Sequence, residues 1–464
     1  MRTTEAITTS LKDQNINNAV MPKLPPELMG KEIVIIGAGL AGSATAYTLG
    51  RGGASPELFE ASNRIGGRVF TDQIEGRKVE RGGELINEDH RTIQGMTGRL
   101  GLTLQNLYSA GQESLNFGLL VDGKHLNQND FVASMKELQS LMGIDIDRYG
   151  GVAEAVSAVK SITLEEYVDN SGVPEWTKNA LKLMFSSEYG IPAKDISASA
   201  LFVEGLQSLE LQKPDLFGVG YGKYKVKEGS SALTTEMTDR IDTVNLEHKL
   251  RKVDFKDNRY TLTFDVAGQE VVRQADVVVI AVPYSALRNV DFSGCDLSLE
   301  RQESIAKMRY AQSNKTFVAC DSQGNDKADS VSLDLGARGF VWNPDRNSSH
   351  PSQVKTLYSH DHETAPTEAD LLARLNRDHE PGHQKIIGKQ SWDTELAGGS
   401  YSIDNGHLST EGRKITEHVG GLYFVGEHTL QNASYMNSAV RSGVAAGLRI
   451  LRNLFSTATT AEPE

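Results

Sequence analysis

The residues best placed to do chemistry are three glycines and an acid near the start of the chain. Gly37, Gly39 and Gly42 form a G-x-G-x-x-G pattern, and Glu60 follows roughly 20 residues later. In such a pattern the first glycine allows a tight turn, the second lets the backbone approach a pyrophosphate, and the third lets a helix pack closely on a strand. Backbone N–H groups then face the phosphates, and the acid accepts hydrogen bonds from ribose hydroxyls. The spacing therefore predicts a site for an unphosphorylated dinucleotide.

A second phosphate-binding element follows at once, where residues 64–68 read R-I-G-G-R. Its glycine pair lets the backbone come close to a phosphate, and Arg64 and Arg68 supply bidentate positive charge. The two arginines and the glycine loop thus act on the same kind of ligand.

The elements that must position these residues can be predicted from local patterns. Residues 33–36 are a short apolar run between charge and glycine, which is typical of a buried parallel strand. Residues 40–51 are compatible with a helix, and residues 57–59 form the next strand. A lone G-x-G-x-x-G is weak because any glycine-rich turn can produce it. Here a strand precedes it, a helix follows, and the acid ends the next strand, so a true dinucleotide site is favoured.

Two stretches resemble the flavin amine oxidase superfamily, which includes monoamine, polyamine and L-amino acid oxidases. The first is E-A-x-x-R-x-G-G-R at residues 60–68, and the second runs from Y-F-V-G-E-H-T at 423 to S-Y-M-N-S-A-V at 434. The family pattern has glycine where this chain has Ser434 and Ser438. The resemblance covers residues 31–451. It implies an α/β fold, with a Rossmann-like FAD-binding domain of the GR2 type and a mixed α+β substrate domain that contains a helical insertion.

The resemblance also implies which residues bind FAD. They are Gly37, Gly39, Leu40, Ala41, Gly42, Glu60, Ala61, Arg64, Gly67, Arg68, Gly82, Gly83, Glu84, Leu250, Trp392, Gly426, Glu427, Tyr435, Met436 and Ala439. In the family the G-G pair passes beside the flavin ring, where a Cβ would collide with the flat cofactor. Ser400 occupies the place of the cysteine that attaches FAD in mitochondrial monoamine oxidases. Serine cannot form that thioether, so non-covalent FAD is expected.

Five residues are expected to act on the substrate. Lys315 aligns with the family lysine that holds a water against the flavin and assists the reaction with oxygen. Tyr401 and Tyr435 match the aromatic cage, which guides an amine and tolerates its cation. Trp392 is expected near the flavin edge, and Glu84 can pair with the second ammonium of a diamine. Taken alone, the lysine, the tyrosines and the glutamate are more often surface or core residues, and the tryptophan is about as often a core aromatic, so these roles depend on the motif match.

By resemblance, the protein is a flavin-containing oxidoreductase acting on CH–NH or CH–NH2 donors. The expected reaction oxidises a primary or secondary amine to an imine and reduces O2 to H2O2. The runner-up is an L-amino acid oxidase. Many of those place an arginine after the G-G pair to bind the substrate carboxylate, whereas this chain has Glu84 there and no arginine before Arg91. An amine dehydrogenase or desaturase and a non-catalytic flavin-binding protein stay as further alternatives.

Segments with different periodicity predict two interleaved domains. The FAD-binding domain is assigned to residues 30–87, 213–290 and 389–455, and residues 71–81 within it to a hairpin. The substrate domain is assigned to residues 88–212, which form the helical insertion, and 291–388. Residues 1–29 are expected to be a flexible extension, and residues 456–464 a disordered tail.

Composition limits the partners and the compartment. The formal net charge of −13 argues against nucleic acid and anionic membrane. No window approaches about 18 consecutive apolar residues, and no signal pattern opens the chain, so a cytoplasmic protein is expected. Cys295 and Cys320 lie far apart without metal-ligand spacing, so neither a disulfide framework nor a metal site is expected. The oligomeric state stays open, a homodimer being the common choice for soluble assemblies.

Overall fold

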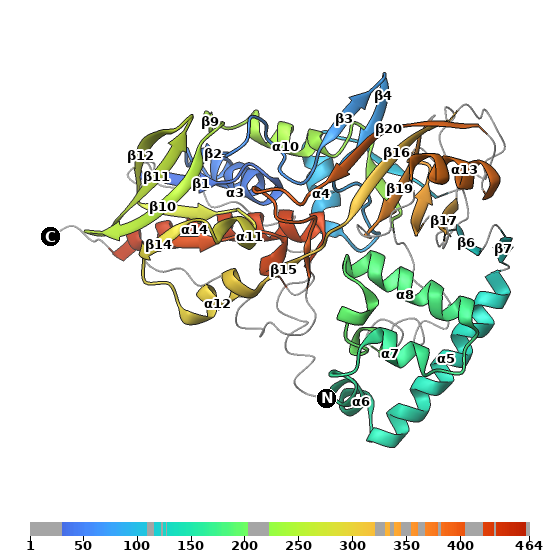
Figure 1. The fold of residues 1–464 in the computed structure, drawn as a ribbon. Helices are drawn as coiled ribbons and strands as arrows, with labels where there is room; N and C mark the ends of the chain where they lie inside the picture. The colour runs from blue at the N-terminus through green and yellow to red at the C-terminus, as the bar shows by residue number, and fades with distance from the viewer. Residues whose placement is uncertain are drawn as a thin grey trace.

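The structure is a computed structural model of the 464-residue chain. It describes residues 30–108, 116–121, 124–126, 128–202, 222–320, 330–334, 338–344, 354–360, 367–378, 382–403, 421–430 and 433–460. The predicted flexible extension, residues 1–29, lies outside the described residues. The described chain forms two halves that lie beside one another, with a group of helices below the second half (Figure 1).

The first half is built on a five-stranded parallel sheet of order β22-β13-β1-β2-β9. Its strands are β1 (Ile33–Ile36), β2 (Glu57–Phe59), β9 (Thr243–Asn245), β13 (Val277–Ile280) and β22 (Leu422–Phe424). All four residues of β1 are buried, as the continuous apolar run predicts for a central parallel strand. The sheet therefore collects strands from nearly the whole length of the chain.

The two faces of this sheet are covered by different layers. Ile33 and Ile35 pack in one core with α3 (Leu40–Arg51) and α14 (Met436–Thr460), whereas Val34 and Ile36 pack in another core on the opposite face. A four-stranded sheet lies on that opposite face, made of β10 (Lys249–Lys256), β11 (Arg259–Val266), β12 (Gln269–Ala275) and β14 (Asp291–Gly294). Alternate residues of β1 point to opposite faces, so the strand joins the two layers.

Several segments near the predicted domain boundaries pack with the first half. α4 (Arg91–Arg99) shares a core with α3 and α14, and β5 (Leu104–Asn106) pairs with β8 (Tyr224–Val226). α10 (Ser231–Thr238) lies in the same core. The sequence assignment placed residues from 88, and from 291 onwards, in the other domain, yet α4 and β14 contact this half.

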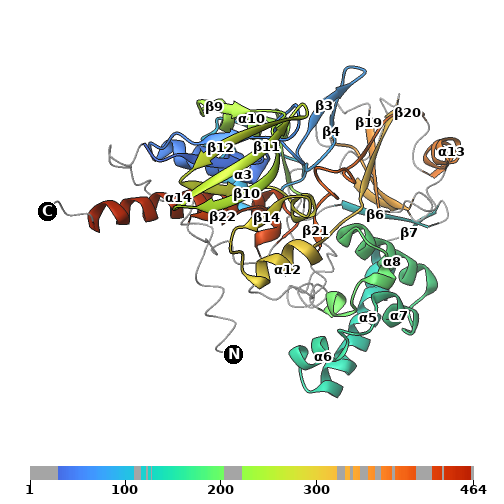
Figure 2. The ribbon, with the colours of Figure 1, turned by 60° about the vertical axis from the view of Figure 1, so that its left-hand side comes forward.

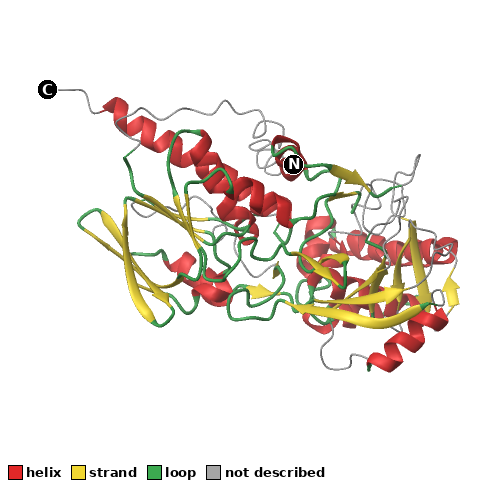
Figure 3. Cartoon of the chain, turned by 90° about the horizontal axis from the view of Figure 1, so that it is seen from above, coloured by secondary structure: helices red, strands yellow, loops and turns green. Residues whose placement is uncertain are grey.

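The predicted hairpin is present, as β3 (Thr71–Ile74) and β4 (Arg77–Glu80). The turn between them has left-handed backbone at Glu75 and Gly76, which suits a two-residue hairpin loop. At the other end of the chain, α14 runs to Thr460, whereas a disordered tail was predicted from residue 456 onwards (Figure 3).

The second half is built on a seven-stranded mixed sheet of order β20-β16-β19-β18-β17-β6-β7. The strands are β6 (Asn116–Val121), β7 (Lys124–Leu126), β16 (Asn314–Cys320), β17 (Ser330–Asp334), β18 (Gly339–Trp342), β19 (Val354–Ser359) and β20 (His383–Ser391). Only β17 and β6 pair in parallel among them. Val341 packs with α13 (Glu368–Asp378), whereas its neighbours Phe340 and Trp342 pack with the helical insertion, so the two helical layers cover opposite faces.

The part of the helical insertion that the structure describes includes helices α5 to α8, which lie below this sheet (Figures 1 and 2). They are α5 (Gln128–Tyr149), α6 (Val152–Ala158), α7 (Leu164–Asp169) and α8 (Glu175–Tyr189). Short elements complete the fold: α11 (Tyr284–Leu287), α12 (Leu299–Lys307), β15 (Arg309–Tyr310), β21 (Ser402–Ile403), and single turns at Ala193–Asp195 and Glu427–Thr429. Among the described residues, no helix has the length and apolarity needed to span a membrane.

Candidate active site

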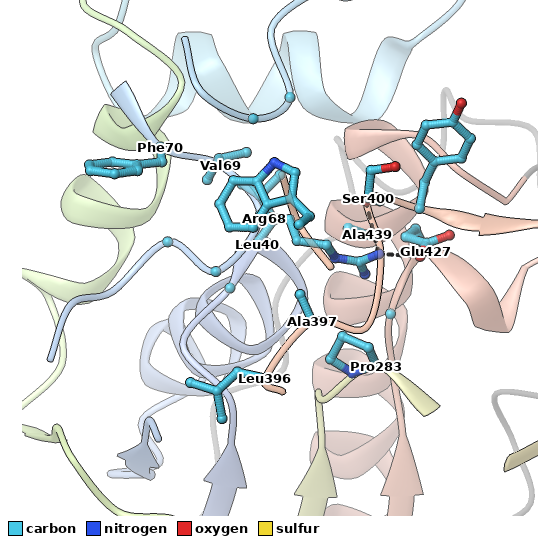
Figure 4. Close-up of a pocket in the computed structure, with 18 of the residues that line it drawn as sticks. Leu40, Arg68, Val69, Phe70, Pro283, Leu396, Ala397, Ser400, Glu427 and Ala439 are labelled. Carbon is cyan, nitrogen blue, oxygen red and sulfur yellow. Dashed lines mark hydrogen bonds and ion pairs between the residues drawn. The ribbon is translucent and has the colours of Figure 1, made fainter. Parts of the chain in front are cut away.

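A single cavity of about 810 Å³ extends from the glycine loop after β1 to the strands of the seven-stranded sheet. Figure 4 shows part of its wall, where residues from α3, α14 and the loops around 68, 283 and 397 converge. Every residue predicted from the sequence to bind cofactor or substrate lines this cavity, with the exception of Gly42. Residues more than 300 positions apart in the chain are thus gathered around one space.

The glycine loop shows two different reasons for glycine. A Cβ on Gly42 would lie 1.9 Å from the carbonyl oxygen of Gly37, so helix α3 could not approach β1. A Cβ on Gly39 would meet none of the surrounding protein atoms closer than 3.8 Å, and Gly39 lines the cavity. Gly39 is also the N-cap of α3, and no side chain caps the helix. The open N–H groups and the missing side chain fit a pyrophosphate in the cavity.

Glu60 is held firmly at the end of β2. One carboxylate oxygen accepts the backbone N–H of Ala38 at 2.9 Å, and the other accepts the N–H and the hydroxyl of Ser62 at 2.9 and 2.8 Å. Because the glycine loop itself donates to Glu60, the acid is fixed beside the place where a ribose would follow the pyrophosphate.

Arg64 and Arg68 have separate tasks in the R-I-G-G-R loop. Arg64 donates to the carbonyl of Gly67 at 2.8 Å and lies 4.2 Å over the ring of Phe70, and its burial lowers the pKa of the guanidinium. It therefore holds the loop in shape. Arg68 forms an ion pair of 2.9 Å with Glu427, which is drawn as a dashed line in Figure 4.

Glu427 joins the C-terminal segment to the rest of the site. Its carboxylate also accepts the hydroxyl of Ser402 at 2.6 Å and the N–H of Ser434 at 2.8 Å. Burial alone would raise the pKa of Glu427, but the charge of Arg68 and these hydrogen bonds outweigh it and keep the pKa below its usual value. Glu427 is therefore ionised and fixes the loop that precedes α14.

Lys315 is at the centre of a buried charged cluster. Its ammonium donates to the carbonyls of Glu80 and Gly82 at 3.0 and 2.9 Å and to the carboxylate of Glu84 at 2.8 Å. A lysine has three N–H donors, so these contacts use all of them. The side chain of Glu84 is 3% exposed and also faces the indole N–H of Trp342 at 3.5 Å. Lys315 thus ties β16 to the G-G element.

Glu80 adds a second carboxylate to this cluster. Burial, followed by the charge of Glu84, raises the pKa of Glu80 to about 7. The hydroxyl of Thr71 and the N–H of Ser230 donate to it at 3.0 and 3.2 Å. Because the single ammonium of Lys315 lies near the buried carboxyl groups of both Glu80 and Glu84, one of the two acids is more stable in its neutral form.

Tyrosine hydroxyls meet at the end of the cavity nearest the helical insertion. The hydroxyls of Tyr358 and Tyr401 are 2.8 Å apart, and Tyr401 donates to the carbonyl of Glu188 at 2.8 Å. Tyr435 donates to the carboxylate of Glu188 at 3.3 Å. Burial raises the pKa of Tyr358 to about 12 and that of Tyr401 well above its usual value. The side chains of Tyr358 and Tyr401 are therefore neutral phenols, and the faces of such aromatic rings can orient an amine.

The sequence profile described as "flavin containing amine oxidoreductase" matches residues 40–451, which is most of the chain. The chain belongs to the flavin-containing amine oxidoreductase family. Among solved structures it is similar to cyclohexylamine oxidase from Brevibacterium oxydans, with a TM-score of 0.74, 22% identity, and coverage of 91% of this chain and 99% of that one. It is also similar to putrescine oxidase bound to putrescine, with a TM-score of 0.72, 18% identity and coverage of 91% and 99%. L-amino acid oxidase Bs29 from Bothriechis schlegelii is 23% identical over 455 residues, covering 91% of this chain and 90% of the relative.

Family membership confirms several predictions. The chain is a flavin-containing amine oxidoreductase, its cofactor is a flavin, and its substrates are a small-molecule amine and O2. The predicted α/β architecture, with a Rossmann-like domain and a mixed α+β part, is confirmed as well. Among the residues that the structure describes, no group of three or more histidines, cysteines or acids could hold a metal ion.

The flavin amine oxidoreductase site also contains residues that sequence reasoning missed. Glu188, Ser313, Trp342 and Tyr358 line the cavity, but no motif surrounds any of them. His428 lines it too, with neither ring nitrogen hydrogen-bonded among the described residues; burial lowers its pKa to about 3. The histidine is therefore neutral. Only Glu188 carried a local signal, since an acid two residues before a helix-ending glycine opposes the helix dipole.

Proposed function

We propose that this flavin amine oxidoreductase binds FAD without a covalent bond and oxidises primary or secondary amines, with O2 reduced to H2O2. The single observation that supports this most is the continuous cavity, which joins a phosphate-ready glycine loop to a wall of neutral tyrosines. A bound flavin supplies the acceptor for the hydride and the centre that O2 reoxidises. We also propose that the parallel-sheet half holds FAD and that the other half selects the substrate.

The chain's own residues have distinct roles in this proposal. Tyr401 and Tyr435 form two walls that orient the neutral amine and exclude water from the reacting carbon. Lys315 has no N–H donor to spare in this arrangement, so it acts through its positive charge, held beside the carbonyl of Gly82. Such a charge stabilises negative charge that develops when O2 is reduced.

Non-covalent binding is supported by the side chain at Ser400. Its hydroxyl donates to the carbonyl of Ala311 at 2.9 Å, and serine has no thiol with which to form a thioether. Acid precipitation of the purified protein should leave the yellow colour in the supernatant. Colour in the pellet would refute the non-covalent assignment.

An L-amino acid oxidase is the second candidate, because curated relatives across 91% of the chain carry that name. The cations on the cavity wall argue against it. Among the described residues of the wall, Lys315, Arg68 and Lys249 already pair with carboxylates, and Arg81 pairs with Asp72. Arg64 donates instead to the backbone carbonyls of Ile65 and Gly67. A substrate carboxylate would have to compete for one of them.

Anaerobic titration of the oxidised protein with monoamines, diamines and L-amino acids tests the proposal. Amines should bleach the flavin absorbance, and readmitted O2 should restore it with one H2O2 formed per flavin. Bleaching by amino acids alone would favour the second candidate. Bleaching by amines without reoxidation by O2 would indicate a dehydrogenase, and a protein that takes up no flavin would overturn the proposal.

A further inference from the structure

Glu84 is a buried acid on the cavity wall to which the proposed reaction gives no step. Its side chain is 3% exposed, and it directly follows the G-G element. One carboxylate oxygen accepts the ammonium of Lys315 at 2.8 Å, and the other faces the indole N–H of Trp342 at 3.5 Å. Both oxygens meet protein donors, so the partner of Glu84 in this structure is Lys315.

The other groups around the Lys315 ammonium carry no net negative charge. The carbonyls of Glu80 and Gly82 accept two of its hydrogen bonds, and the ring of Trp342 lies 5.5 Å away. On β19 its register partner is Tyr358, which stays a neutral phenol because burial raises its pKa to about 12. On β20 the register partner is an uncharged glutamine at position 390.

The carboxyl of Glu80 does not take the place of Glu84 beside the ammonium. It accepts the hydroxyl of Thr71 and the N–H of Ser230 instead. Burial, and then the charge of Glu84, raise the pKa of Glu80 to about 7, so this acid is neutral through the acidic range. Among the residues that the structure describes, Glu84 is therefore the one carboxylate in contact with Lys315.

The nearest charged pair of the same loop is also satisfied internally. The guanidinium of Arg81 lies between the two residues whose carbonyls bind Lys315, and it pairs with Asp72 at 2.7 Å. Neither member of this pair is left over to balance or oppose the ammonium. The charge state of Lys315 thus depends mainly on Glu84.

A buried ammonium needs a counter-charge to keep its proton. Burial disfavours the charged form of a lysine, and a fully buried lysine without a partner releases its proton about 3–5 pH units lower than in water. A carboxylate in contact reverses this effect. Because Lys315 acts through its charge in the proposed function, loss of its proton would remove its effect on O2.

We propose that Glu84 is a positioning residue that keeps Lys315 protonated, and that this pair sets the pH range in which the reduced enzyme reacts rapidly with O2. The proposal rests on the proposed function, in which the charge of Lys315 assists the reduction of O2. In that reaction O2 takes up two electrons from the reduced flavin and two protons, from the flavin and the solvent, and leaves as H2O2. Lys315 gives up neither; its charge favours the arrival of the first electron on O2.

Stopped-flow mixing of photoreduced holoenzymes with O2 from pH 6 to 10 tests the proposal without any amine. Each rate is divided by that of Lys315→Met at the same pH, so that titration of the flavin itself cancels. The wild type should keep a constant ratio of about 100 or more up to about pH 9. In Glu84→Gln the ratio should fall toward one, with a midpoint at least about 2 pH units below that of the wild type. The control Asp169→Asn removes the carboxylate of a more exposed 2.8 Å lysine pair and should match the wild type.

The midpoint potential of the bound flavin follows the same charge without O2. Nearby positive charge stabilises the reduced flavin, so the potential of Glu84→Gln should approach that of Lys315→Met over the same pH interval in which reoxidation slows. Glu80→Gln/Glu84→Gln prevents the second acid from ionising in place of the first, and should shift the decline to still lower pH. In Glu84→Asp the carboxylate is one methylene shorter, so its decline should lie between those of the wild type and Glu84→Gln.

The outcomes separate this proposal from the proposed function. A constant ratio in Glu84→Gln across the pH range, or a wild-type ratio that has already declined by pH 7, would overturn the proposal. Glu84→Asp carries the test if Glu84→Gln does not retain flavin, and a profile identical to the wild type would then overturn it. If Lys315→Met reoxidises as fast as the wild type, the oxygen role of Lys315 fails, and the midpoint potentials decide on Glu84. Failure of every amine to reduce the flavin counts against amine oxidation alone.

Discussion

Replacing Lys315 by methionine separates the structural role of this residue from its role toward oxygen. The change removes the partner of Glu84, whose side chain is 3% exposed, and leaves a buried carboxylate without its ammonium. Breaking one side of a buried ion pair typically destabilises a protein by about 3–5 kcal/mol. Lys315→Met should therefore lower the free energy of unfolding by an amount in this range.

The double variant Lys315→Met/Glu84→Gln removes both charges together. A neutral amide needs no counter-charge, so most of the lost stability should return. The remaining deficit should be about 1–3 kcal/mol, because the carbonyls of Glu80 and Gly82 still lack their donor. Lys182→Met is the control: its ion pair with Asp169 has the same 2.8 Å length but is more exposed, so its loss should cost at most about 1 kcal/mol.

Urea unfolding of the holoenzymes, followed by circular dichroism, measures the stabilities, and stopped-flow mixing of the reduced enzymes with O2 measures reoxidation. We expect both variants that lack Lys315 to reoxidise slowly, whatever their stability. Equal stability of Lys315→Met and the double variant would refute the buried-pair reasoning. Reoxidation that recovers in the double variant would refute the role of the positive charge.

Three further predictions concern the surroundings of the site. In the folded protein the pKa of Glu80 is raised from 4.5 to about 7, so the stability that its neutral form contributes is complete below pH 4.5 and is lost as the pH rises to about 7. This loss should be about 3 kcal/mol. Glu80→Gln should remove it, as measured by unfolding curves recorded from pH 4.5 to 8. Gly42→Ala should abolish flavin retention on gel filtration, because its Cβ would meet the carbonyl of Gly37. In Gly98→Ala the new Cβ would meet nothing within 4 Å beyond its own helix, so this variant should keep the flavin and gain about 0.5–1 kcal/mol of folding stability. Ser434 has a φ of 76°, so Ser434→Gly should be about 1 kcal/mol more stable than Ser434→Ala, and equal melting temperatures would contradict a strained backbone there.

Local patterns were sufficient for much of the fold. The strand at residues 33–36 and the helix at 40–51 occur as predicted, because a buried parallel strand and a glycine-led helix each have a signature within a few residues. The hairpin around Gly76 was likewise predicted from its local sequence pattern and is present. Of the 22 site residues predicted from motif matches, 21 line one cavity. The exception is Gly42, which allows helix α3 to pack closely against the turn at Gly37.

What the sequence could not give is pairing across long separations. Lys315 and Glu84 are 231 residues apart, and no local sequence pattern around either residue indicates that the two form an ion pair. Tyr358 enters the site because β19 pairs with β16, and Glu188 because α8 packs under the same sheet. The domain boundaries were difficult for the same reason. α4 looks like part of a helical insertion by periodicity, and only its contacts place it against α14.

The order of strands in the parallel sheet has a consequence for biosynthesis. β13 pairs with β1 on one side and with β22 on the other, and β22 is formed by residues 422–424. At translation speeds of about 5–20 residues per second, on the order of 7–30 s pass between the synthesis of β13 and that of β22. During this interval β13 presents an unpaired edge, and the Arg68–Glu427 link does not yet exist. The nascent polypeptide should therefore depend on chaperones until its last segment leaves the ribosome, and should capture its flavin only afterwards.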